Sequence, residues 1–175
     1  SGDGCTNKYG RHYQIGFAGD KRYDIEYYNN KIIPIVKKLF NIQSCYSRTR
    51  ENGMWFNFHS KSLFELLTIR FQMPAGVKFD KVLVPKEIMN GNVKHKIAFL
   101  RGVFDTDGCV FFDKRKPYKE PYMRVDITMY NIPILTQLRQ ILTEAGIPSN
   151  VLGNGKHLHV TSKKDVRKFF EIVGS

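Results

Sequence analysis

The chain has 175 residues, 42% of them hydrophobic and 13% aromatic, which is enough for one ordinary domain or two small halves around a core. No run approaches the roughly 20 apolar residues of a membrane span, and the first residues do not resemble a signal peptide. Its 28 Lys and Arg outnumber 16 Asp and Glu, and the net charge of +12 favours a polyanionic partner. A generic basic protein, ribosome-associated or thermophilic, is the alternative.

The first part of the chain alternates between strand and helix patterns. After a polar turn that follows Gly4, the predicted elements are a strand at 11–18, a helix at 21–39, hairpin strands at 43–50 and 54–59, and a helix at 61–71. Ser60 directly precedes the last of these helices, so we expect its side chain to cap the helix N-terminus.

A linker and a second set of elements follow. Residues 73–92 contain Pro74, Gly76 and Pro85, which are typical of a connecting segment. The predicted elements after it are a helix at 93–105, hairpin strands at 109–114 and 122–129, a helix at 132–145, short strands near 151 and at 157–161, and a helix at 163–173. Gly146 is expected to end the helix before it, and Ser162 to cap the last helix.

The two parts match each other at a nearly constant spacing. Gly2-Asp3-Gly4-Cys5 corresponds to Thr106-Asp107-Gly108-Cys109 at an offset of 104 residues. Residues 40–42 correspond to 145–147 at an offset of 105, and residues 59–61 correspond to 161–163 at an offset of 102. Three matches in the same order indicate an internal duplication. The sequence therefore predicts a first half at 1–72, a linker at 73–92 and a second half at 93–175.

Three cysteines bear on the compartment. The chain contains an odd number of cysteines, namely Cys5, Cys45 and Cys109, and none of them has the C-x-x-C spacing of a zinc site. We expect reduced thiols without disulfides, as in an intracellular protein that is not secreted.

The run from Leu100 to Gly108 carries the most specific chemistry. Ile97, Leu100 and Phe104 form an apolar stripe, and Gly102 would let another backbone approach closely. The helix then ends in Asp105 and Asp107, where the helix dipole is already negative. A divalent cation would offset this cost, and Mg²⁺ prefers such oxygen ligands. An ordinary Asp-Gly turn that closes a helix is the alternative for the acidic residues alone.

The nine residues 100–108, preceded by Ala98-Phe99, resemble the LAGLIDADG motif. The resemblance extends to the duplicated layout and points to the archaeal-type, single-chain homing endonucleases. It implies an α+β fold with two αββαββα halves, in which two antiparallel, saddle-like sheets surround a central two-helix seam. It also implies a pseudo-symmetric monomer that cuts both strands of a long, asymmetric DNA target, as in intron or intein mobility.

The resemblance further implies a set of catalytic and metal-binding residues. The last acidic residue of each motif, Asp3 in the first and Asp107 in the second, would bind metal beside the scissile phosphates. The backbone carbonyls of Gly2 and Thr106 would be additional ligands. The metal would be Mg²⁺ or Mn²⁺, with Ca²⁺ able to bind without supporting cleavage.

The family also places basic residues near each catalytic site. Lys81, with Lys78 as the second choice, lies in the segment ahead of the second motif, and Lys21 follows the first long strand. For any one of these lysines, a solvated surface charge is the alternative interpretation.

The first motif departs from the family pattern. Only its tail, Ser1-Gly2-Asp3-Gly4, is present, and the helix that should carry it is missing from this chain. The sequence leaves open whether the chain is a fragment or trimmed, or whether a partner supplies the helix. Without that helix, we expect apolar side chains such as Leu100 and Phe104 to be exposed.

The strands carry the basic, aromatic and amide side chains that read bases and contact phosphates. The candidate DNA-binding residues are Arg11, Tyr13, Tyr46, Arg48, Arg50, Trp55, Asn57, His59, Lys114, Arg115, Lys116, Tyr122, Arg124, His157 and His159. An ordinary solvent-facing sheet is the alternative for each residue, and a one-residue slip in register would reverse the two faces.

A second hypothesis keeps the fold without the chemistry. The chain would then be a catalytically silent nucleic-acid binder, such as an intron maturase or a transcription factor, although the acidic pair Asp3 and Asp107 favours the nuclease. A basic RNA-binding protein with a chance motif is a more distant alternative.

Overall fold

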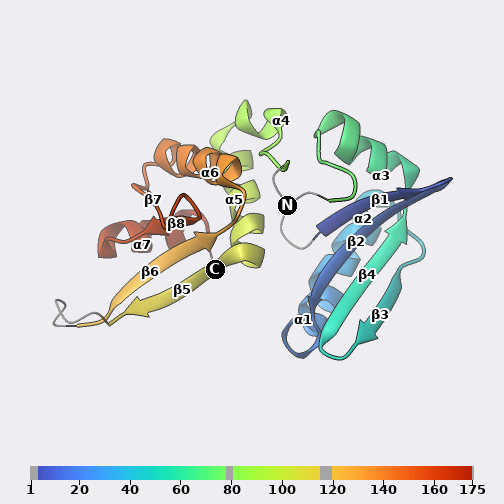
Figure 1. The fold of residues 1–175 in the computed structure, drawn as a ribbon, viewed down its shortest axis with the longest axis horizontal. Helices are drawn as coiled ribbons and strands as arrows, with labels where there is room; N and C mark the ends of the chain where they lie inside the picture. The colour runs from blue at the N-terminus through green and yellow to red at the C-terminus, as the bar shows by residue number, and fades with distance from the viewer. Residues whose placement is uncertain (1–3, 78–80, 115–119, 175) are drawn as a thin grey trace. The chain divides into compact units, whose positions relative to one another are not determined.

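The chain folds into two compact units that divide between residues 78 and 79 (Figure 1). The computed structural model describes residues 4–77, 81–114 and 120–174. Each unit combines a four-stranded antiparallel sheet with helices, so the predicted α+β class is confirmed. The segment predicted as a linker, 73–92, contributes residues to both units and includes a short helix.

The sheet of the first unit has the strand order β1-β2-β4-β3. Its strands are β1 (Gly4–Tyr9), β2 (His12–Asp20), β3 (Tyr46–Arg50) and β4 (Gly53–His59). Strand β1 is a correction, because the residues after Gly4 were predicted to form a polar turn. It is an edge strand that buries Thr6 but no large apolar side chain, so it lacks the apolar alternation that marks a strand in sequence.

The helices of the first unit cover one face of this sheet. They are α1 (Lys21–Tyr27), a π-helical turn (Tyr28–Ile32), α2 (Ile33–Phe40), α3 (Lys61–Glu65) and a second π-helical turn (Leu66–Arg70). The core joins Phe56 and Phe58 of the sheet to Val36 and Phe64 of the helices. The hydroxyl oxygen of Ser60 accepts a hydrogen bond from the Leu63 amide at 3.2 Å, which confirms the predicted cap.

The sheet of the second unit repeats this order as β5-β6-β8-β7. Its strands are β5 (Gly108–Asp113), β6 (Tyr122–Thr128), β7 (Asn150–Leu152) and β8 (His157–Val160). Strand β5 begins 104 residues after β1, and α7 begins 102 residues after α3. These spacings equal the sequence offsets, so the matched segments occupy equivalent places in the two units.

The helices of the second unit are α4 (Lys86–Met89), α5 (Val93–Asp107), α6 (Ile132–Glu144) and α7 (Lys163–Ile172). Their apolar side chains and those of β6 and β8 form one core, in which Leu135, Leu138 and Phe169 are fully buried. The side chain of Ser162 caps α7 by accepting a hydrogen bond from the Asp165 amide, as predicted. In the ranges described, no helix is both long and apolar enough to cross a lipid bilayer.

A buried lysine connects α5 to α6. The Lys96 ammonium group lies 2.6 Å from a carboxylate oxygen of Glu144. The hydrogen bond from Lys96 lowers the pKa of the Glu144 carboxyl, and a second hydrogen bond from Gln140 acts in the same direction. Burial of an amine inside this core is tolerated because its charge is paired.

The apolar stripe of α5 packs inside the second unit. Leu100 is fully buried in this core, and the Phe104 ring meets the Phe169 ring edge-on at 4.9 Å between centroids. The expectation that Leu100 and Phe104 would be exposed without a first motif helix was therefore wrong, because α6 and α7 supply their packing partners. At Gly102, an added Cβ would meet no atom within 4 Å among the described residues, so the close approach predicted there is not found.

Replacing Phe169 by Ala should destabilise the second unit by about 3–5 kcal/mol, because it leaves a cavity and removes the packing against Phe104. Ile172→Ala on the same helix is the matched control, since Ile172 is 37% exposed while Phe169 is fully buried. Urea unfolding followed by circular dichroism measures both changes. Equal reductions of the unfolding free energy in the two variants would contradict the assignment of Phe169 to the core.

Candidate functional site

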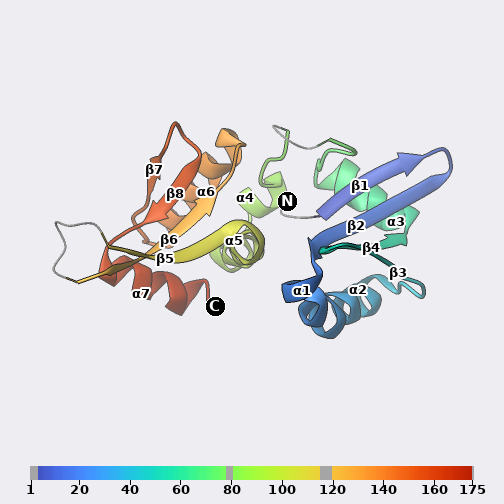
Figure 2. The ribbon, with the colours of Figure 1, turned by 60° about the horizontal axis from the view of Figure 1, so that its bottom comes forward.

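Asp107 is the last residue of α5, and Gly108, directly after it, begins β5. Figure 2 shows α5 and β5 next to each other in the second unit. Asp107 is half-buried, and one of its carboxylate oxygens lies 2.9 Å from the Thr106 hydroxyl, which can donate to it. The last turn of α5 contains no basic residue, and Asp105 adds a second, exposed carboxylate. Negative charge therefore accumulates at this helix end.

This helix end offers hard oxygen ligands to a cation. The last carbonyl groups of an α-helix lack an N–H partner within the helix, and Thr106 and Asp107 are the last two residues of α5. Carboxylate and carbonyl oxygens are the ligands that Mg²⁺ and Mn²⁺ prefer. The described residues Thr106 and Asp107 therefore fit a divalent cation of this class.

Gly108 makes the turn from α5 into β5 possible. An added Cβ at this position would overlap the Phe104 ring and would lie 2.5 Å from the Phe104 carbonyl oxygen. The Gly108 amide donates to that same carbonyl and closes the helix. A residue without a side chain is thus required directly after Asp107, and the Asp-Gly pair of the motif has a steric cause.

The other predicted catalytic residues are placed only in part. Asp3, Gly2 and Lys78 lie outside the described residues. Lys81 is an exposed residue of the second unit, just ahead of α4. Lys21 is the exposed first residue of α1, and its backbone amide donates to the Asn52 carbonyl at 2.7 Å.

The sheet of the first unit turns one face away from its helices. Along β4, Met54, Phe56 and Phe58 are buried, so the alternating residues between them face outward. The antiparallel pairing sets Arg48 opposite Trp55 and Tyr46 opposite Asn57. Six candidate DNA-binding residues consequently share this outer face, namely Tyr46, Arg48, Arg50, Trp55, Asn57 and His59.

Tyr13 does not share this face, contrary to the prediction. Tyr13 is two residues from Ile15 on β2, so both side chains lie on the helix side of the sheet. The centroid of the Tyr13 ring is 5.3 Å from that of the Phe64 ring. His12 and Gln14 take the outward positions instead, since they pair with Tyr9 and with Asn7 and His59. Arg11 lies in the exposed turn between β1 and β2.

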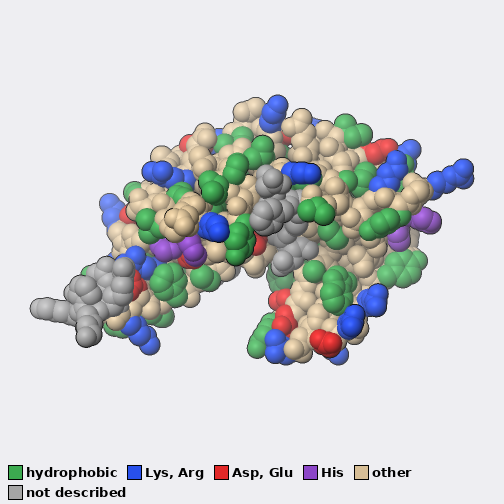
Figure 3. All heavy atoms as spheres, viewed as in Figure 1, with side chains coloured by type: hydrophobic (Ala, Val, Ile, Leu, Met, Phe, Trp, Pro, Cys, Tyr) green, Lys and Arg blue, Asp and Glu red, His purple; other side chains and the backbone are tan. Residues whose placement is uncertain are grey.

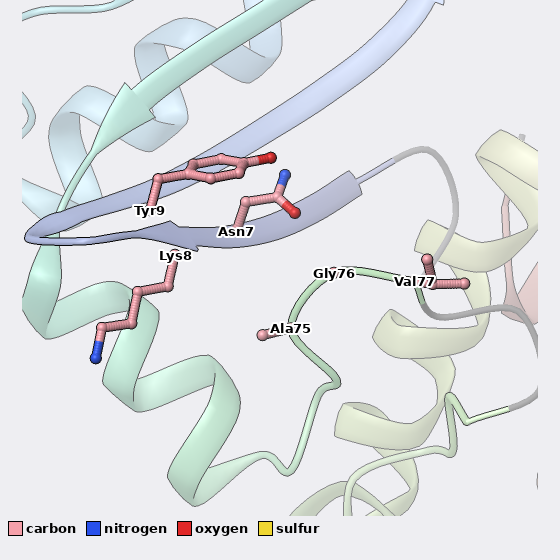
Figure 4. Close-up of a pocket in the computed structure, with 6 residues that line it drawn as sticks. All are labelled: Asn7, Lys8, Tyr9, Ala75, Gly76 and Val77. Atoms are coloured by element: carbon pink, nitrogen blue, oxygen red, sulfur yellow. The ribbon is translucent and has the colours of Figure 1, made fainter.

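Strand β1 extends the outer face at the edge of the sheet. Asn7 and Tyr9 project from one side of β1, and Lys8 projects from the other (Figure 4). Together with residues 75–77 they line a shallow, open recess of the first unit. None of the catalytic candidates that the structure describes, which are Lys21, Lys81 and Asp107, lines this recess.

The sheet of the second unit has an equivalent outer face. Val125 and Ile127 of β6 are buried under the helices, so Tyr122 and Arg124 face outward. His157 and His159 of β8 share this face, because their strand buries Leu158 and Val160. Lys114 is exposed after β5, whereas Arg115 and Lys116 lie outside the described residues.

Acidic side chains that no sequence motif marks lie against these outward-facing side chains. A guanidinium nitrogen of Arg124 lies 2.8 Å from an oxygen of Asp113, and both side chains are nearly buried. Asp126 lies between His157 and His159, at 3.1 and 3.2 Å. Burial raises the pKa of the Cys109 thiol, and the charge of Asp126 adds to this shift. These pairs depend on strand register, which no local sequence pattern encodes.

In the view of Figure 3, histidine side chains are visible at one place on each unit. On the first unit, the rings of His12 and His59 lie 5.9 Å apart. On the second, those of His157 and His159 lie 5.7 Å apart. The two outer faces are therefore alike in presenting imidazoles next to basic and aromatic side chains.

The second unit matches the family model of the LAGLIDADG-like domain over residues 94–174. This range contains α5, the Asp107-Gly108 junction and the whole second sheet. Residues 94–174 are therefore similar to the LAGLIDADG-like domain. The motif inferred from residues 100–108 is thereby confirmed as a family feature, and it lies on the helix that the resemblance implied.

Solved LAGLIDADG structures share the fold of the whole chain. A structure of the homing endonuclease I-DmoI in complex with DNA and Mn is 16% identical, with a TM-score of 0.66, over 98% of this chain and 88% of that one. The N-terminal LAGLIDADG domain of DUF199/WhiA is 15% identical, with a TM-score of 0.55, over 99% of this chain and 76% of that one.

A curated relative has a different overall size. The ribonucleoside-diphosphate reductase NrdEB subunit alpha of Bacillus subtilis (strain 168) is 29% identical over 98 residues. The match covers 56% of this chain and 8% of the length of that relative.

Replacing Gly108 by Ala should displace the end of α5, because the new methyl group cannot fit beside Phe104 without a backbone shift. We expect weaker binding of Mn²⁺ and a decrease in unfolding free energy of about 1–3 kcal/mol. Gly102→Ala in the same helix is the control, since its Cβ would enter open space. Isothermal titration with Mn²⁺ and urea unfolding measure these effects, and native-like behaviour of Gly108→Ala would contradict them.

Proposed function

We propose that the chain is a site-specific, double-strand DNA endonuclease of the homing type that depends on a divalent metal. The observation that carries the proposal is the carboxylate of Asp107 at the C-terminal end of α5, in a LAGLIDADG helix whose last turn has no basic residue. The likeness to DNA-bound homing endonuclease structures supports the same assignment.

The chemistry proposed is hydrolysis of a phosphodiester. A water oxygen forms a bond to phosphorus, the bond to the 3′ oxygen breaks, and the water proton balances the charge of the departing oxygen. The products are a 5′-phosphate and a 3′-hydroxyl. A bound Mg²⁺ or Mn²⁺ supplies a more acidic water ligand and offsets negative charge on the phosphate.

Within this proposal, each residue of the chain has a separate task. Asp107 and the Thr106 carbonyl hold the metal, and Asp3 with the Gly2 carbonyl would do the same in the first motif. Lys81, Lys78 and Lys21 are proposed to stabilise charge near the phosphates. A duplicated chain needs no second copy, so we propose a monomer that acts on a long, asymmetric site.

The outer faces of the two sheets are the proposed DNA-binding surface. Both faces combine Arg, His and aromatic side chains, and two-stranded ribbons fit the major groove of B-DNA. The exposed Arg48 and Arg50 of β3 could contact phosphates or guanines, whereas Tyr13 points into the helix layer and is omitted.

A catalytically silent binder is the alternative, and the likeness to the WhiA LAGLIDADG domain supports keeping it. The two candidates differ in one outcome. A nuclease cuts DNA in the presence of metal, whereas a silent binder retains it uncut under the same conditions.

The test uses the Asp107→Asn variant and a plasmid library that carries candidate target sites. With Mg²⁺ or Mn²⁺ the native protein should linearise a subset of plasmids, and Asp107→Asn should cut them roughly 100-fold more slowly or worse, because a charged metal ligand is removed. Asp105→Asn is the matched control, since it removes an exposed carboxylate of the same helix end. Gel electrophoresis and sequencing of the new ends measure the cuts.

Two outcomes of this experiment would count against the proposal. If the native protein binds the plasmids in the presence of each metal ion tested but never cuts them, the silent-binder alternative is favoured. If Asp107→Asn cuts as fast as the native protein, the nuclease stands but Asp107 is not its metal ligand.

A second prediction concerns the first outer face. The double variant Arg48→Ala/Arg50→Ala should bind duplex DNA more weakly and should reduce the slope of log K against log salt by up to about 0.9 for each phosphate that is no longer neutralised. Lys37→Ala/Lys38→Ala on α2 is the control, because it removes the same charge from exposed residues on the helix side. Fluorescence anisotropy at several salt concentrations measures both. Equal weakening in the two variants would mean that net charge, not this face, determines binding.

A further inference from the structure

Three ligand-bearing side chains that are not part of the LAGLIDADG run meet on the outer face of the second sheet. Asp126 of β6 and His157 and His159 of β8 bring one ligand atom each to within 4.8 Å of one another. The nearest atoms are His157 Nδ1 and Asp126 Oδ2 at 3.1 Å, and His159 Nε2 and Asp126 Oδ1 at 3.2 Å.

The register of two strands brings these residues together. His157 and His159 are two residues apart on β8, so both imidazoles leave the sheet on the same side. The pairing of β6 with β8 sets Asp126 directly opposite His159 and Thr128 directly opposite His157. The cluster is therefore built on backbone hydrogen-bonded elements and not on a loop.

The carboxylate of Asp126 is held in position and still has capacity to accept a ligand. The Thr128 hydroxyl donates to its Oδ2 atom at 2.7 Å, and the side chain is only 8% exposed. Its Oδ1 atom is buried, and among the described residues no hydrogen bond of ordinary geometry reaches it. A buried carboxylate oxygen in this state is unfavourable unless a cation is nearby.

The distances between the ligand atoms are compatible with one shared metal ion. With bonds of about 2.0–2.1 Å and tetrahedral angles, two ligand atoms of one zinc ion lie about 3.3 Å apart. The two His–Asp distances of 3.1 and 3.2 Å are close to this value. The His157 side chain is 39% exposed, so an ion could reach the cluster from solvent.

We propose that Asp126, His157 and His159 bind a divalent transition-metal ion of the zinc class. Two imidazoles and one carboxylate are the ligand set of zinc and related ions with open positions, whereas Mg²⁺ prefers oxygen ligands alone. The site is thus chemically distinct from the helix end at Asp107. Thr128 acts as a supporting residue that orients the carboxylate.

The test is binding of Zn²⁺ and Co²⁺ to the purified protein at neutral pH, without DNA, so its result is independent of the proposed nuclease function. Competition with a chromophoric chelator measures the Zn²⁺ affinity, and the visible spectrum of bound Co²⁺ reports its coordination. We expect one ion bound with a spectrum typical of imidazole and carboxylate ligands. The His157→Ala/His159→Ala variant should bind roughly 100-fold more weakly or worse, since even supporting residues of metal sites contribute about 10–100-fold.

Three control variants separate this cluster from other groups that bind the same ions. His12→Ala/His59→Ala removes the histidine pair of the first sheet, Cys109→Ser removes the thiol that lies opposite Asp126 in the β5–β6 pairing, and Asp107→Asn removes the proposed nuclease ligand. All three should bind the Co²⁺ ion that produces this spectrum as the native protein does. Absence of that ion from any of them, with retention in His157→Ala/His159→Ala, would overturn the assignment.

A measurement on the native protein avoids dependence on how the variants fold. Paramagnetic Co²⁺ should shift or broaden the imidazole NMR signals of His157 and His159 before it affects those of His12 and His59. Equal effects on all four imidazoles, or none on His157 and His159, would overturn the proposal.

Discussion

One-sided covering of each sheet by its own helices is the constraint on which the rest of the structure depends. In β4, burial of Met54, Phe56 and Phe58 fixes which residues face the helices. A slip of one residue would exchange the two faces, and each large apolar side chain moved into water would cost about 1.5–3 kcal/mol. Three such residues in one strand are sufficient to hold the register, and the register in turn orients Trp55, Asn57 and His59 outward.

The second unit uses its core in the same way to place an unfavourable charge. A carboxylate at a helix C-terminus costs about 0.3–1 kcal/mol when exposed, because the helix dipole is negative there. Burial of Leu100 and Val103 in the same helix contributes several times that amount. The core therefore decides where α5 ends, and Asp107 remains at a position that only a cation would favour.

Much of this could be predicted from local sequence, because the decisive interactions are local. Ser60 and Ser162 cap helices through hydrogen bonds to residues three positions later, and Gly146 ends α6 with a positive φ of 69°. The LAGLIDADG run could be recognised because nine consecutive residues carry it. Strand β1 could not be predicted in this way, because it is a strand through its pairing with β2 and its own residues have no apolar alternation.

Contacts between distant residues were beyond prediction for a related reason. Tyr13 was grouped with DNA-facing residues, yet the parity set by Ile15 turns it toward Phe64. Asp126 carried no signal at all, because its environment exists only once β6 pairs with β8, about thirty residues later in the chain. Side chains on a sheet acquire their neighbours from register, and register is decided by the core on the opposite face.

The same reasoning explains how a face rich in acidic groups can still suit a polyanion. On the second outer face, Asp113 is paired with Arg124, and Asp126 is in contact with His157 and His159. Both carboxylates are nearly buried, so little of their surface is presented to solvent. The exposed groups that remain include Lys114 and the His157 imidazole. The electrostatic character of the face is consequently set by which side chains are exposed and not by a count of the charges along its strands.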